Sequence, residues 1–289
     1  MFQMRRRSLT FAGVFIGGAK MGSNVVSSVM IPELFSVRDK VVLITGAGGM
    51  GEVYAKAFAA NKAKVAIASR RRESLEKIRE KLNGEGYECS VYQVDVADKE
   101  AVETTVQQIE ADFGRIDVLI HTPAIAKLGP SLDFNEKDFR DTIDINFFGA
   151  VYMNVAAAKV MRKNKWGRII NINSIDGFSV NCVDDLPYSA SKSAMMALTR
   201  HLAVDLAKEG VTVNGIAPVW IWTPMMEQRP GDYMVKAAET IPMGRCSYCE
   251  DYLGMTFFLA SEASAYVTGQ TFFVDGGWSV CRAFKYSEQ

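Results

Sequence analysis

Tyr188 and Lys192 have the most distinctive chemistry in this sequence, because they stand four residues apart in Tyr188-Ser189-Ala190-Ser191-Lys192. Residues at this spacing lie on one face of a helix. A phenol titrates near pH ~10, and a neighbouring ammonium group favours its ionised form. The pair therefore predicts a tyrosine that exchanges a proton with an alcohol or carbonyl oxygen. The same spacing occurs by chance on many helices, so the rest of the chain has to support this interpretation.

The elements that would position this pair alternate regularly along the chain. Short, nearly continuous apolar runs predict buried strands, at residues 41–44, 64–69, 90–94, 118–120, 168–172, 211–216 and 271–274. Helical patterns lie between them, one through Val53, Ala57 and Phe58, and others at 139–163, 188–208 and 250–260. This order predicts an α/β fold, with a single Rossmann-type doubly wound parallel sheet and helices on both faces.

Composition limits the kind of partner. Of the 289 residues, 48% are hydrophobic, and 33 basic residues balance 33 acidic ones. There is no basic surplus for nucleic acid, so a small-molecule substrate is the expected partner. Five scattered cysteines do not resemble a disulfide framework. Cys246 and Cys249 form one C-x-x-C pair, but the chain has only two histidines, so no metal site is expected.

Residues 1–35 are expected to be an N-terminal extension, and residues 36–289 the folded domain. Arg5–Arg7 precede a mildly apolar segment at 9–19, which resembles a short export signal or a transit peptide. A non-folding leader, or a start codon placed too early, would look the same. We expect a cytoplasmic protein, with export or an organelle as the alternative if residues 1–32 act as a targeting signal. No apolar run reaches the ~20 residues that a membrane span requires.

A glycine-rich loop, GAGGMG at residues 46–51, follows the first strand and precedes a helix. Glycine lets the backbone turn tightly and approach a pyrophosphate group. The helix that follows offers free N–H groups and the positive end of its dipole. We therefore expect this segment to bind a dinucleotide, through Gly46, Gly49, Met50 and Gly51.

The end of the second strand bears on which dinucleotide is bound. Sites for NAD usually have Asp or Glu here, to bind the ribose 2′-hydroxyl. This chain has Ser69, Arg70 and Arg71 instead, and guanidinium groups suit a 2′-phosphate. The sequence therefore predicts NADP(H) in preference to NAD(H), with Arg70 as the main contact. The same arginines would also suit the solvated start of the next helix.

With its motifs in the order in which they occur along the chain, the sequence resembles the classical short-chain dehydrogenases/reductases over residues 36–280. The resemblance rests on the glycine loop, on the Tyr188/Lys192 pair and on further motifs at family spacing. These further motifs are Asp95 after the third strand, Asn146 in Asp144-Ile145-Asn146, Ser174 in Asn171-Ile172-Asn173-Ser174, Val213-Asn214-Gly215-Ile216-Ala217-Pro218, Thr223-Pro224, and Val267-Thr268-Gly269-Gln270 with Val274-Asp275-Gly276-Gly277. It implies an oxidoreductase acting on alcohol and carbonyl groups. It also implies a homotetramer, formed through the two long helices and the C-terminal end.

The resemblance assigns roles to single residues. Tyr188 would be the general acid/base, Lys192 would lower its pKa and hold the nicotinamide ribose, and Ser174 would hydrogen-bond the substrate oxygen. Asn146 would support the proton relay through a water. The cofactor contacts implied in addition to the glycine loop and arginines are Asp95, Val96, Thr122, Pro218 and Thr223.

Several segments depart from the family pattern. The glycine loop is one residue shorter than the usual Thr-Gly-x-x-x-Gly-x-Gly. His121 begins a His-Thr-Pro-Ala stretch that replaces Asn-Asn-Ala-Gly, and we expect an interior histidine or a new polar contact. The loop before Tyr188 is one residue longer and contains Asp184 and Asp185, either as a solvated turn or as substrate contacts. Pro-Val replaces Pro-Gly after the sixth strand, so the expected pocket wall is Val219, Trp220, Trp222 and Met225.

The sequence therefore predicts an NADP(H)-dependent oxidoreductase that interconverts a ketone and a secondary alcohol. The aromatic wall favours a partly apolar or ring-shaped substrate, although a sugar or polyol is also compatible. Because of the departures, the alternative is a catalytically weak protein that binds or senses NADP(H). The spacing of Ser174 and Tyr188 disfavours an enoyl reductase or an epimerase.

Overall fold

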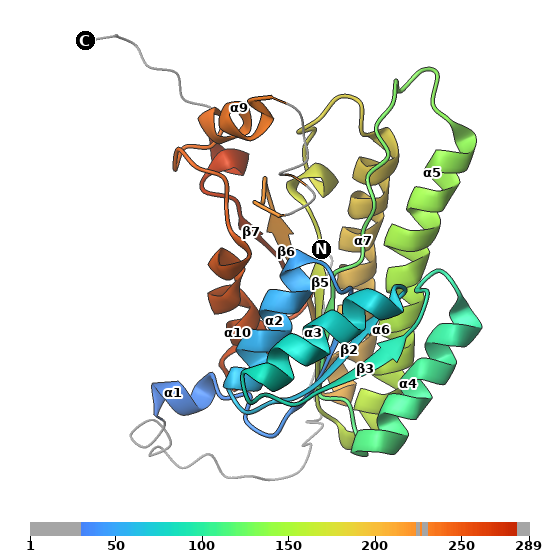
Figure 1. Cartoon of the computed structure of the whole chain (residues 1–289), viewed down its shortest axis with the longest axis vertical. Helices are drawn as coiled ribbons and strands as arrows, with labels where there is room; N and C mark the ends of the chain where they lie inside the picture. The colour runs from blue at the N-terminus through green and yellow to red at the C-terminus, as the bar shows by residue number, and fades with distance from the viewer. Residues whose placement is uncertain (1–29, 224–225, 227–230, 282–289) are drawn as a thin grey trace, which may run out of the picture.

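In the part of the chain that the structure describes, seven parallel strands form one continuous sheet (Figure 1). This computed structural model describes residues 30–223, 226 and 231–281. The strands lie in the order β3-β2-β1-β4-β5-β6-β7. Their bounds are β1 Val41–Thr45, β2 Lys64–Ser69, β3 Cys89–Gln93, β4 Val118–His121, β5 Gly167–Ile172, β6 Val211–Pro218 and β7 Thr271–Val274.

Helices cover both faces of the sheet (Figure 1). One face packs against α4 (Lys99–Phe113), α6 (Gly149–Met161) and α7 (Leu186–Leu206), and the other against α2 (Gly49–Ala60), α3 (Arg72–Gly84) and α10 (Leu253–Ala260). Successive side chains of a strand point to opposite faces. Leu43 therefore faces the α4 layer, and its neighbours Val42 and Ile44 face the α2 layer. Burial on both faces explains why the strands are almost continuously apolar and confirms the predicted fold.

Three local differences separate the structure from the sequence-based expectation. The helix after the glycine loop buries Tyr54, Ala55 and Phe58, whereas Val53 and Ala57 are only partly buried. The long helix expected at 139–163 is divided into α5 (Glu136–Ile143), a π-helical turn (Asp144–Phe148) and α6. The short helices α1 (Ile31–Leu34) and α9 (Tyr233–Glu239) have no counterpart in the expectation.

The strand order fixes where a ligand can bind. β1 pairs with β2 on one side and with β4 on the other, so the chain reverses its direction of progress across the sheet at this point. In open α/β sheets, ligands bind beyond the carboxyl ends of the strands at such a switch point. The loops that follow β1 and β4 are therefore the place to look for the site.

The segment before β1 touches the domain. The ring of Phe35 lies 6.2 Å from that of Phe258 on α10, and Val37 is 2% exposed. The boundary expected at residue 36 stays a prediction, and the targeting segment falls mostly on residues 1–29, outside the described residues. Among the described helices, none is both long and apolar enough to cross a membrane.

Candidate active site

Ser174 lies just beyond the carboxyl end of β5. Its hydroxyl oxygen accepts a hydrogen bond from the backbone N–H of Asp176 at 3.2 Å and thereby caps a short 3₁₀ turn, Ile175–Gly177. The Ser174 hydroxyl lies close enough to the Tyr188 phenol to lower its pKa. The end of β5 and the start of α7 therefore bring the two predicted proton-handling groups together.

Tyr188 and Lys192 lie in the first turns of α7, which begins at Leu186. Lys192 Nζ is 5.5 Å from the centre of the Tyr188 ring and donates to the Ile172 carbonyl oxygen at 2.8 Å. Lys192 is 1% exposed, whereas Tyr188 is only partly buried. Part of the Tyr188 side chain therefore reaches the surface, while the Lys192 ammonium group is enclosed.

A glycine lets the 3₁₀ turn reach α7. A Cβ added to Gly177 would lie 2.8 Å from the backbone carbon of Lys192, well inside ordinary contact distance. Ser193 Oγ donates to the Gly177 carbonyl oxygen at 2.9 Å. These contacts hold the turn that follows Ser174 directly against the part of α7 that contains Lys192.

Burial governs the ionisation of this cluster. It raises the pKa of the Tyr188 phenol, because the phenolate is poorly solvated; the Ser174 hydrogen bond opposes the rise, and the Asp176 and Asp185 carboxylates add to it. Burial lowers the pKa of Lys192 to about 7, and Asp176 opposes that shift. Burial of the phenol therefore dominates the pKa of Tyr188, and the lowering expected from Lys192 stays a prediction.

Asn146 lies in the π-helical turn and is fully buried. Its Oδ1 accepts from the backbone N–H of Ile125 at 2.8 Å, and its Nδ2 donates to the Ile125 carbonyl oxygen at 2.9 Å and to Ser191 Oγ at 3.0 Å. The side chain thus ties the segment after β4 to α7, next to Lys192. Single π-turns inside helices are frequent at functional sites. The predicted relay through a water stays a prediction.

Asp176 is a site residue that the sequence reasoning missed. Its Oδ2 accepts from Ser174 Oγ at 2.9 Å, and its Oδ1 accepts from the backbone N–H of Asn181 at 3.1 Å. Burial raises its pKa, and Ser174, Asn181 and Lys192 oppose the rise. The available signal was a carboxylate two residues after the serine, at the spacing of a capped turn.

The glycine loop after β1 is shaped by a positive φ angle at one glycine and by a close backbone approach at another. Gly46 has a φ of +91°, which favours glycine. A Cβ added to Gly51 would overlap the Gly46 carbonyl oxygen. α2 then begins at Gly49, with no side chain capping its first N–H groups. A tight backbone turn with uncapped donors fits a pyrophosphate group, and Met50 is partly buried beside it.

Arg70 and Asp95 meet at the carboxyl ends of β2 and β3. The Arg70 guanidinium lies 3.9 Å from Asp95 Oδ2, and both side chains are largely open to solvent. Ser69 ends β2, Arg71 immediately precedes α3, and Val96 is buried. The structure therefore places these predicted cofactor residues along one edge, on the β2 side of the glycine loop.

His121 replaces the usual asparagine at the end of β4 and is fully buried. Its Nδ1 lies 2.9 Å from Thr45 Oγ1, while its Nε2 has no hydrogen-bond partner among the described residues. Burial lowers its pKa to about 3, and the nearby Lys192 charge adds to this. It is thus an interior, neutral histidine. Beside it, Thr122 Oγ1 donates to the Thr45 carbonyl oxygen at 2.6 Å and holds the end of β1.

The expected pocket wall leaves the sheet after Pro218, the last residue of β6. The backbone N–H of Trp222 donates to the Ser247 carbonyl oxygen at 2.8 Å, and that of Ser247 donates to the Trp220 carbonyl oxygen at 2.9 Å. Trp220 packs edge-to-face on Tyr233 of α9, with ring centres 5.4 Å apart. The two tryptophans are thus held in a cluster with α9 and are only partly exposed.

Val219 and Thr223 flank this segment. Val219 lines a cavity of about 220 Å³ together with Ile241 and Asp275, at the same edge of the sheet. Thr223 is partly buried. The predicted pocket residue Met225 lies outside the described residues.

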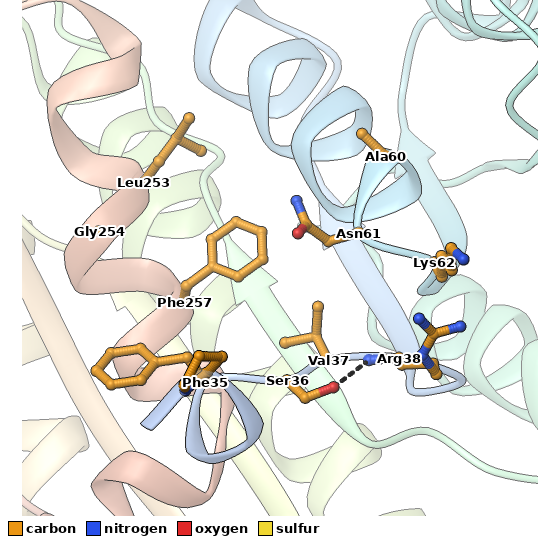
Figure 2. A pocket seen from close by; sticks show the side chains of 11 residues that line it. Phe35, Ser36, Val37, Arg38, Ala60, Asn61, Lys62, Leu253, Gly254 and Phe257 are labelled. Carbon is orange, nitrogen blue, oxygen red and sulfur yellow. Dashed lines mark hydrogen bonds between the residues drawn. The ribbon is translucent and has the colours of Figure 1, made fainter. Parts of the chain in front are cut away.

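A second cavity, of about 570 Å³, lies at the opposite edge of the sheet. Figure 2 shows the side chains that line it. It is bordered by Phe35 and Arg38 before β1, by Lys62 after α2 and by Phe257 of α10. Those elements precede the strands rather than follow them. This cavity is therefore separate from the cluster around Tyr188.

Comparison with known proteins agrees with this geometry. A family model described as enoyl-(acyl carrier protein) reductase matches residues 46–279. Gluconate 5-dehydrogenase of Gluconobacter oxydans (strain 621H) is 34% identical over 252 residues, which are 86% of this chain and 98% of that protein. The 5-keto-D-gluconate 5-reductase of Escherichia coli (strain K12) is 34% identical over 251 residues, with the same two coverages.

A solved structure adds a cofactor. Gluconate 5-dehydrogenase from Burkholderia cenocepacia J2315, in complex with NADP and tartrate, matches with a TM-score of 0.80 at 29% identity, covering 86% of this chain and 98% of that one. Fold, site and similarity together define an NAD(P)-dependent dehydrogenase or reductase that acts on alcohol and carbonyl groups. The chain belongs to the short-chain dehydrogenase/reductase family.

Proposed function

We propose that this protein is an NADP(H)-dependent oxidoreductase that interconverts a ketone and a secondary alcohol, with Tyr188 as the general acid/base. The observation that supports this most is the cluster of Ser174, Tyr188 and Lys192 at the carboxyl edge of the sheet. This cluster follows β5, and the glycine loop follows β1 at the same edge of the sheet. The substrate proposed is a hydroxylated or ring-shaped ketone.

The residues of the chain divide the work as follows. The nicotinamide cofactor supplies the hydride when it is bound. In reduction, Tyr188 donates its phenolic proton to the carbonyl oxygen, and its raised pKa keeps that proton in place. Ser174 and Tyr188 stabilise the charge that develops on the oxygen. The Lys192 ammonium, 5.5 Å from the ring, stabilises the resulting phenolate. In oxidation the same groups act in reverse.

Replacing the phenol tests the proposed mechanism. Tyr188→Phe should lower the rate of NADPH oxidation with a responsive ketone by about 10³-fold, because the proton donor is lost. NADPH binding, followed by cofactor fluorescence, should persist. The ketone panel should include 5-keto-gluconate and cyclic apolar ketones.

Tyr266 offers a matched control, because it is fully exposed. Tyr266→Phe should react like the wild type. Full activity in Tyr188→Phe would contradict the mechanism. Tight NADPH binding with no hydride transfer to any ketone in the wild type would favour the alternative, a catalytically weak binding or sensing protein.

We also propose that Arg70 gives the site its preference for NADP(H). Arg70→Ala should raise the dissociation constant for NADPH by about tenfold, the usual effect of losing one charged hydrogen bond, and should leave that for NADH nearly unchanged. Arg72→Ala is the control, because Arg72 pairs with Glu76 within α3. Equal effects of Arg70→Ala on the two cofactors, in direct titrations, would argue against this role.

The assembly proposed is a homotetramer in the cytoplasm. Phe148, in the π-helical turn before α6, and Val204 on α7 are exposed apolar side chains, 40% and 78% exposed respectively. Exposed apolar groups on neighbouring helices are typical of a face that packs against another subunit. Light scattering should give a mass of four chains, and a monomer would contradict the proposal.

A further inference from the structure

Asp176 is a buried carboxylate that the proposed mechanism does not use. It is 9% exposed and lies on the 3₁₀ turn Ile175–Gly177. Its two oxygens accept from Ser174 Oγ at 2.9 Å and from the backbone N–H of Asn181 at 3.1 Å. Because Gly177 packs directly on the Lys192 backbone, the position of this carboxylate relative to α7 is fixed.

The hydrogen-bond capacity of Ser174 shows what this carboxylate does. A serine hydroxyl donates one hydrogen bond and accepts two, whereas an ionised carboxylate only accepts. The 2.9 Å contact therefore takes the single Ser174 proton. The Ser174 oxygen already accepts from the Asp176 N–H, so the hydroxyl keeps one acceptor position and no donor for the neighbouring Tyr188 phenol.

We propose that Asp176 is a positioning residue, which holds the Ser174 proton away from the reacting oxygen until the substrate draws it across, and whose charge sets the pH range in which the site works. The proposal rests on the proposed function of Ser174 and Tyr188. It assigns a role to a residue that does not itself touch the substrate.

The charged and titratable groups around Asp176 determine the sign of its effect. From α7 these are Tyr188 and Lys192, with Asp185 at the start of that helix and His121 beyond Lys192. The Asp176 charge raises the pKa of both Tyr188 and Lys192. Removing that charge should therefore lower both values together.

Asp176→Asn keeps the shape of the side chain and removes the charge. The whole pH profile of kcat, in either direction of the reaction, should move to lower pH by about 1 unit, as expected for the loss of a nearby charge. Asp184→Asn is the matched control, because it removes the same charge from an exposed position on the same loop. That variant should leave the profile in place.

A second readout needs neither cofactor nor turnover. The free energy of unfolding in urea rises with pH once folded Lys192 loses the proton that the unfolded chain retains. In Asp176→Asn this rise should begin about 1 pH unit lower than in the wild type, and in Asp184→Asn at the wild-type pH. If the wild type reduced no ketone, the proposed function would fail. The shift in the stability profile would still show that the Asp176 charge acts on Lys192.

A purely structural Asp176 would give a different result. Asp176→Asn would then lower activity and stability equally at every pH, with both pH profiles unmoved, and this outcome would overturn the proposal. If Asp176→Asn did not fold, Asp176→Ser supplies the same loss of charge with a smaller side chain, and the same two shifts are expected of it.

Discussion

At the scale of single residues, the candidate site is a set of buried ionisable groups that hold one another in unusual states. Lys192 and His121 are both basic side chains with a lowered pKa, because burial disfavours their charged forms. Tyr188 has a raised pKa for the same reason. Perturbed values that cluster in one place are typical of functional sites.

His121 allows a prediction about acid stability. Its pKa is lowered to about 3 in the folded protein, against 6.5 for an ordinary histidine. Between these values the unfolded chain binds a proton that the folded chain does not, so the free energy of unfolding falls as pH falls. Between about pH 7 and about pH 4, His121 should account for a loss on the order of 3 kcal/mol in the free energy of unfolding. His121→Asn should therefore lose less stability than the wild type in urea unfolding between about pH 7 and about pH 4.

The second histidine supplies the control. His201 is exposed on α7, and His201→Asn should keep the pH dependence of the wild type. If His121→Asn lost as much free energy of unfolding on acidification as the wild type, His121 would not be a buried neutral group.

Single residues also show where sequence reasoning reached its limit. The Tyr188/Lys192 pair could be predicted because a helix fixes the distance between positions four apart. Asp176 could not, because its role depends on a 3₁₀ turn that brings it back to Ser174. The rise in the pKa of Tyr188 could not be predicted, because spacing reveals a neighbouring charge but not the depth of burial.

At the scale of elements, strands were easier to predict than interruptions in helices. The strands at 64–69 and 271–274 begin and end where the sequence predicts, because apolar runs bounded by polar residues mark them clearly. The π-helical turn at Asp144–Phe148 is set by the contacts of Asn146 with Ile125 and Ser191, which are distant in sequence. The short helix α9 is held by packing with Trp220, which periodicity does not reveal.

The glycine loop gives a prediction for an element. Gly51→Ala should lower the free energy of unfolding by about 1–3 kcal/mol, the usual cost of overpacking, because the added Cβ would overlap the Gly46 carbonyl oxygen. It should also weaken NADPH binding. Gly84→Ala, where the added Cβ meets nothing, should be neutral or slightly stabilising in the same urea titrations. Equal stability of the two variants would show that the loop is not tightly packed.

At the scale of the whole molecule, the strand order collects residues that are far apart in the sequence. The glycine loop follows β1, Arg70 follows β2, His121 ends β4 and Ser174 follows β5, all at the carboxyl edge of one parallel sheet. The cavity beside Phe35 lies at the other edge. This arrangement could be predicted from the alternation of strands and helices, whereas the shape of the substrate wall around Trp220 could not.

The central claim is that hydride reaches a carbonyl carbon whose oxygen receives its proton from Tyr188. The most direct test is the reduction of a conjugated enone by NADPH that has deuterium at the transferable position. The account predicts one deuterium on the carbon that bears the new hydroxyl group, with the double bond intact, and about 10³-fold slower formation of that product by Tyr188→Phe. Deuterium at the far end of the double bond, with the ketone retained, would contradict it and indicate an enoyl reductase.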